Sequence, residues 1–230
     1  MTDDIPDTAL AQTLATLAAI RPIALTCVGA GSAILVVALL FSAEENALFA
    51  LLQSVVMAVV SFAATRHFLS EGRAPLLGPS AILVSPAFIP FMQLEVLLTA
   101  LFEIIERLTE MSAVLSALGF LALVALIVFL ARYGTVFPAF VAGGDTSLTA
   151  ASERGTTKAL LMRIIAAYGL GFVLAAGLIL LPSVMLERSF GVSAPLGIAL
   201  MAPLMMAMNV FVSVLIAVIL SKAYQGRYRP

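Results

Sequence analysis

The stretch AVLSALGFLALVALIVFLA, Ala113–Ala131, is almost entirely apolar and carries no charged side chain. A helix needs roughly 20 such residues to cross the ~30 Å hydrocarbon core of a bilayer. Arg132 follows at once, and basic residues are common where a span meets the cytoplasmic interface. The stretch therefore predicts a transmembrane helix.

The rest of the chain has the same character. Of its 230 residues, 62% are hydrophobic and only 11% are charged, and the mean hydropathy is +1.14. Soluble domains use about 45–50% apolar and about 25% charged residues. The composition therefore predicts an all-α fold, a single polytopic membrane bundle.

Six apolar runs are long enough to span the membrane. They are predicted at about 22–41, 47–65, 81–102, 113–131, 159–181 and 196–220, with interfacial amphipathic helices at 8–20 and 145–154. The third run contains Pro86, Pro90 and Glu95. It is predicted to be a kinked span, and the alternative is a shallow re-entrant segment before a helix that starts at Pro90.

The basic residues predict how the chain is threaded. With six spans, ten fall on the side of the two termini: Arg21, Arg66, Arg73, Arg132, Arg154, Lys158, Arg163, Lys222, Arg227 and Arg229. Only Arg107 and Arg188 fall on the other side. Cytoplasmic loops carry an excess of Lys and Arg, so both termini are predicted to be cytoplasmic. This bias in a compact, loop-poor chain favours a bacterial inner membrane.

The sequence lacks the residues that several classes of function require. Cys27 is the one cysteine and His67 the one histidine, so neither a metal cluster nor an intrachain disulfide is predicted. The net charge of -1 does not favour nucleic acid as a partner. No nucleophile with a nearby base and no phosphate loop is recognisable. The chain is therefore predicted to have no cofactor and not to be an enzyme.

Glu95 is the carboxylate that lies well inside a predicted span. An ionisable group in a membrane costs about 2.5–3.5 kcal/mol at the centre, so it is a functional candidate. Gln93 and Thr99 lie near it on the same run, and Asn209 and Gln53 are polar residues of other spans that could reach it. The alternative is that Glu95 joins Glu103 and Glu106 as the polar end of a partly exposed helix.

Small residues repeat in the fifth run, at Ala167, Gly171 and Ala175. Such a stripe allows two helices to approach closely in lipid, where association depends on packing. Gly29 and Ala33 of the first run are candidates for the facing stripe.

The segment 132–155 lies between two long apolar runs and differs from both in composition. Gly143 and Gly144 predict a turn, after which Asp145 or Thr146 would cap the helix at 145–154. We interpret the segment as a membrane-surface elbow. A candidate surface for lipid headgroups or a partner consists of Arg132, Tyr133, Asp145, Arg154, Lys158 and Arg163.

The same segment carries a family resemblance. The residues that carry it are Arg132, Tyr133, Phe137, Pro138, Ala139, Gly143, Gly144, Ser147, Leu148, Ala151 and Arg154. Their order resembles that in a group of bacterial six-helix membrane proteins, which includes the membrane domain of some glycerophosphodiester phosphodiesterases. Typical members have a Trp near the short helix, which this chain lacks. The resemblance favours an inner-membrane protein over a named transporter, and it implies no particular activity.

Two functions are compatible with these features. The first is a non-enzymatic membrane component that packs with lipid, with another membrane protein or with a second copy of itself. The short loops and the small-residue stripe favour it. The alternative is a small transporter or channel that uses Glu95 in a proline-broken span.

Overall fold

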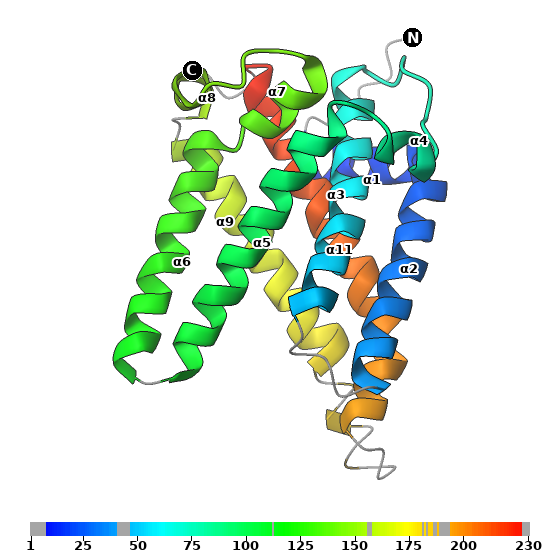
Figure 1. Ribbon diagram of the computed structural model, residues 1–230, viewed down its shortest axis with the longest axis vertical. Helices are drawn as coiled ribbons and strands as arrows, with labels where there is room; N and C mark the ends of the chain where they lie inside the picture. Colours follow the sequence, from blue (N-terminus) through cyan, green and yellow to red (C-terminus); the bar gives the residue numbers. More distant parts are fainter. Residues whose placement is uncertain are drawn as a thin grey trace.

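The structure is a computed structural model that describes residues 8–40, 47–111, 113–155, 158–180, 182, 184–185, 188 and 194–226. These residues form helices joined by turns, and no strand occurs among them (Figure 1). Six of the helices are long and apolar enough to cross a membrane. The predicted six-span, all-α membrane bundle is confirmed.

The six spanning helices follow the predicted apolar runs with changed ends. They are α2 (Arg21–Leu40), α3 (Ala47–Leu69), α5 (Phe88–Met111), α6 (Ala113–Tyr133), α9 (Lys158–Ala175) and α11 (Ala194–Tyr224). A π-helical turn, η1 (Ala176–Leu180), continues α9. The ends predicted at 41 and 181 lie outside the described residues.

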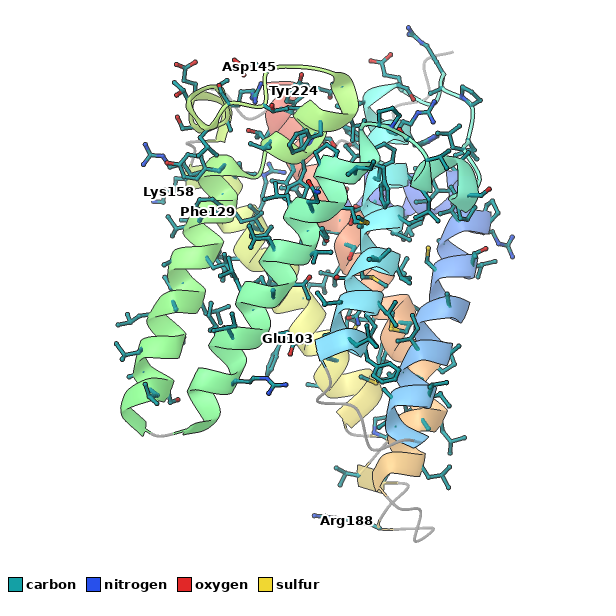
Figure 2. The ribbon with its side chains drawn as sticks, viewed as in Figure 1. Glu103, Phe129, Asp145, Lys158, Arg188 and Tyr224 are labelled. Carbon is teal, nitrogen blue, oxygen red and sulfur yellow. The ribbon has the colours of Figure 1, made fainter. Side chains whose placement is uncertain are left out.

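Four short helices lie at the end of the bundle where α1 begins and α11 ends (Figure 1). They are α1 (Ala9–Ala19), α4 (Pro79–Leu83), α7 (Val136–Ala142) and α8 (Leu148–Gly155). Figure 2 shows Lys158 at this end and Arg188 at the opposite end, which are the sides on which the predicted threading places them. We call this end of the bundle the terminal end.

The spanning helices divide into an inner and an outer set. In α2, α3 and α11, between 39% and 50% of the span residues are buried, whereas the share is 11% to 17% in α5, α6 and α9. Helix α11 packs against α2, α3 and α9, and α5 packs against α3 and α6. The outer helices therefore expose most of their apolar surface, as expected for helices that face lipid.

The third span is not a single kinked helix over 81–102, and this prediction is wrong. Helix α4 ends at Leu83, the chain turns, and a new helix starts at Phe88, two residues before Pro90. Proline is tolerated in the first turn of a helix because the amide it lacks has no partner there. The break moves the span towards the C-terminus, to Phe88–Ile105.

Helix α9 uses its small residues to approach α11. A methyl group added at Gly171 would lie 3.0 Å from Cγ2 of Val212, and Ala167 is buried. The suggestion that Gly29 faces this stripe is wrong, because nothing lies within 4 Å of a Cβ built there.

Candidate functional site

A cavity of about 480 Å³ lies between the inner and outer helices. Residues of α3, α5, α6, α7, α9 and α11 line it. Its walls are mainly apolar, with a small number of polar groups. Ligand pockets in proteins have this size and this composition. The cavity is therefore the candidate site.

The structure brings three of the predicted polar residues to this cavity. Glu95, Thr99 and Asn209 all line it. Helix α5 holds Glu95 and Thr99 one turn apart, and the Thr99 hydroxyl donates to the Glu95 carbonyl oxygen at 3.1 Å. This bond keeps the Thr99 side chain against its own helix, on the face that also presents Glu95.

The other two predicted residues do not join them. Gln93 is exposed, and neither Gln93 nor Gln53 lines the cavity. Gln93 does not line the cavity beside Glu95 because residues two apart on a helix do not share a face. Glu103 lies further along α5 and does not line the cavity, so Glu95 is separated from the polar end of its helix.

Four further polar residues line the cavity that were not predicted. They are Ser61 and Thr65 of α3, Ser213 of α11 and Tyr168 of α9. The Ser213 hydroxyl donates to the sulfur of Met57, at 3.8 Å. Together with Glu95, Thr99 and Asn209, these residues place polar groups from four helices around one space.

A sequence signal for the missed residues exists. Ser61 and Thr65, Glu95 and Thr99, and Asn209 and Ser213 are each separated by four positions. Residues four apart lie on one helical face. Each of three spans thus carries a polar pair at this spacing, and all three pairs line the same cavity.

Aromatic rings form the wall of the cavity towards the terminal end. The rings of Phe91 and Phe137 lie 5.0 Å apart, edge to face, and Phe91 lies 5.4 Å from Phe62. Phe137 and Pro138 come from α7, the short helix at the terminal end, and both line the cavity. Helix α7 therefore covers this end of the cavity.

The cavity also reaches the outer surface of the bundle. Phe172 of α9 lines the cavity and is 73% exposed, and Asn209 of α11 lines it and is exposed. Both residues lie in spanning helices. The cavity therefore reaches the outer surface of the bundle at the depth of the spans.

Local backbone geometry holds α7 in place. Gly143 ends the helix in the left-handed conformation, at φ 66°, which a residue with a side chain rarely adopts. The buried Thr135 hydroxyl donates to the carbonyl oxygen of Ala151 in α8, at 3.2 Å. The segment is thus not only a surface elbow, because Val136–Ala139 are buried in the bundle.

The loop between α7 and α8 is tied by Asp145 and Ser147. The Ser147 amide donates to the Asp145 carboxylate at 2.8 Å, and the Ser147 hydroxyl accepts from the Ala150 amide. Ser147, rather than Asp145 or Thr146, therefore caps α8. The Ser147 amide, with help from its hydroxyl and from Arg154, lowers the pKa of Asp145. This contact is present above the ordinary pKa of an aspartate and is lost as the pH falls through the lowered pKa.

Two residues of the candidate lipid or partner surface, Asp145 and Arg154, contact each other in the structure. Arg154 lies over the ring of Tyr224 at 4.9 Å and donates to the Asp145 carbonyl oxygen at 2.7 Å. Tyr133 packs on Phe129, with ring centroids 4.8 Å apart, and Arg132 lies 5.6 Å from the Tyr133 ring. Lys158 and Arg163 are exposed on α9.

Comparison of the chain with protein-family models, with curated proteins and with solved structures found no match. The geometry of the cavity is therefore what indicates a function. It offers one carboxyl group, several hydroxyl groups and an amide inside an apolar space between membrane helices. Such a space can bind a small molecule or exchange a proton.

Proposed function

We propose that the chain is a small transporter that moves a solute through this cavity, with Glu95 binding a proton or a cation during the cycle. The observation that supports the proposal is the position of Glu95, on the wall of a 480 Å³ cavity between six helical elements. A carboxyl group in a membrane costs free energy, and such groups mark ion and proton pathways in many transporters. The proposed activity requires no covalent chemistry, so we propose that the chain is not an enzyme.

The turn between α4 and α5 supports the same proposal, because it leads directly into the helix that carries Glu95. Glu95 lies in the second turn after the start of α5 at Phe88. A change in the turn between α4 and α5 would therefore move the carboxyl group relative to α3 and α11.

A steric block tests whether solute passes through the cavity. Gly171→Leu places a larger side chain at the contact between α9 and Val212, next to the cavity. Proton flux into proteoliposomes is expected to fall to the level of protein-free vesicles. Gly169→Leu is the matched control, since nothing lies within 4 Å of a Cβ on Gly169. Equal flux through both variants would contradict the proposal.

We also propose that both termini are cytoplasmic, in a bacterial inner membrane. The excess of basic residues at the terminal end supports this orientation. A reporter enzyme that is active only in the cytoplasm, fused after Pro230, should be active. Loss of its activity, with the fusion present in the membrane, would overturn the orientation.

A second candidate function is a component that packs with another membrane protein, with lipid or with a second copy. The low burial of α5, α6 and α9, at 11% to 17% of their span residues, favours it. Such a component should retain a partner or tightly bound lipid when it is isolated in mild detergent. A stable monomer without either would count against this function.

A further inference from the structure

The cavity has a charge and a wall composition that select among classes of ligand. Glu95 is the one carboxylate among the described residues that line it, and these residues include no lysine, arginine or histidine. An anion would therefore meet a carboxyl group and no cationic partner. In a space of low dielectric, this arrangement favours a cation over an anion of the same shape.

The size of the cavity argues against a bare metal ion. Calcium takes six to eight oxygen ligands at about 2.3–2.6 Å, and magnesium needs six in a tight octahedron. The cavity volume is about 480 Å³, and no group of three His, Cys, Asp or Glu residues gathers among the described residues. An organic molecule fills such a space better than an ion does.

Aromatic rings supply the remaining recognition. Phe91, Phe102, Phe137, Tyr168 and Phe172 line the cavity, and the rings of Phe102 and Tyr168 lie 6.3 Å apart. Aromatic faces attract organic cations, and more strongly where water is excluded. The same rings provide apolar contact for a hydrophobic body.

The position of the opening indicates the route of entry. The cavity is covered at the terminal end by Phe137 and Pro138 of α7, whereas it reaches the outer surface at Phe172 and Asn209. This surface belongs to spanning helices and faces lipid. A ligand that enters there has first to partition into the membrane.

We infer that the cavity binds a lipophilic organic monocation, which enters from the membrane and pairs with Glu95. This inference names the ligand class of the transporter proposed above and rests on that proposal. Tetraphenylphosphonium is the probe for the class. Tetraphenylborate has nearly the same shape with the opposite charge, and is the matched comparison.

The test is equilibrium binding of radiolabelled probe to the full chain in lipid nanodiscs, with empty nanodiscs as the background. Tetraphenylphosphonium should bind saturably to the chain. Tetraphenylborate should show no saturable binding above the background. Saturable binding of the borate with equal or higher affinity would overturn the inference, and so would the absence of saturable phosphonium binding.

A charge pair at Asn209 makes the test sharper. Asn209 is exposed at the mouth of the cavity, so either substitution is compatible with the packing of α11. Asn209→Lys should weaken phosphonium binding by on the order of tenfold, and Asn209→Asp should strengthen it. Protection of the buried Cys27 thiol from a maleimide reports that both variants are folded. Equal affinities in two folded variants would contradict the inference.

The binding test is separate from the transport test. If the probe binds as expected and no variant changes flux, the ligand class stands and the transport function fails. If the flux depends on the cavity and the phosphonium does not bind, the transport function stands and the ligand class fails.

Discussion

Replacing Glu95 by glutamine is expected to reduce proton flux to the level of protein-free liposomes. Glutamine has nearly the same shape as glutamate, so the walls of the cavity keep their packing. It cannot release or accept a proton at neutral pH. The measurement is acidification of a pH dye inside proteoliposomes, driven by a potassium gradient and valinomycin.

Glu103→Gln is the matched control for this substitution. It removes the same charge from the same helix, at a position that does not line the cavity. If both variants lose flux equally, the cause is the charge of α5 and not the cavity. If the Glu95→Gln variant transports protons at the wild-type rate, the proposed role of Glu95 is wrong.

Replacing Phe137 by alanine is expected to have the largest effect on stability. Phe137 is 5% exposed and its ring packs on Phe91 at 5.0 Å. Truncation of a buried Phe to Ala costs about 3–5 kcal/mol, because packing is lost and a void remains. In a chain of this size, the unfolding midpoint should fall by roughly 10 °C.

Cys27 offers a direct measurement of this midpoint. It is the one cysteine of the chain and is 4% exposed, so a thiol-reactive dye labels it only when the bundle opens. The Phe137→Ala substitution also removes the cover that α7 places over the cavity, so passive proton leak should rise. Phe137→Leu keeps an apolar side chain there and should restore most of both properties.

Phe120→Ala is the control for this experiment. Phe120 is 63% exposed on α6, so its truncation removes little packing within the bundle. The control should leave the midpoint and the leak near the wild-type values. A Phe137→Ala variant that matches the control would show that α7 neither packs nor covers the cavity as described.

The sequence by itself determined the class of fold, because the physical requirement is local. A span must be apolar over about 20 residues, and this property is visible in each run without knowledge of its neighbours. The count of six spans and the common side of the termini followed from the same runs and from the distribution of basic residues.

The sequence also indicated part of the site. Glu95 was recognisable because a carboxylate inside an apolar run is costly wherever it points. Helical spacing predicted that Thr99 shares a face with Glu95. Gln93 lies on a different face, because two residues along a helix correspond to about 200° of rotation. The break before α5 was predicted only as the alternative, with a helix starting at Pro90, because Pro86 and Pro90 are compatible with both a kink and a break.

Only the tertiary structure decided where the cavity lies and what covers it. Tyr168 and Ser213 reach Glu95's cavity because α9 and α11 pack closely at Gly171 and Val212. Helix α7 packs in the bundle because the Thr135 hydroxyl donates a hydrogen bond to Ala151 of α8 and the Phe137 ring packs on Phe91 of α5. In each case the partners are far apart in the chain. Local patterns predict which face of a helix is polar, whereas the choice of the helix opposite that face depends on packing between distant segments.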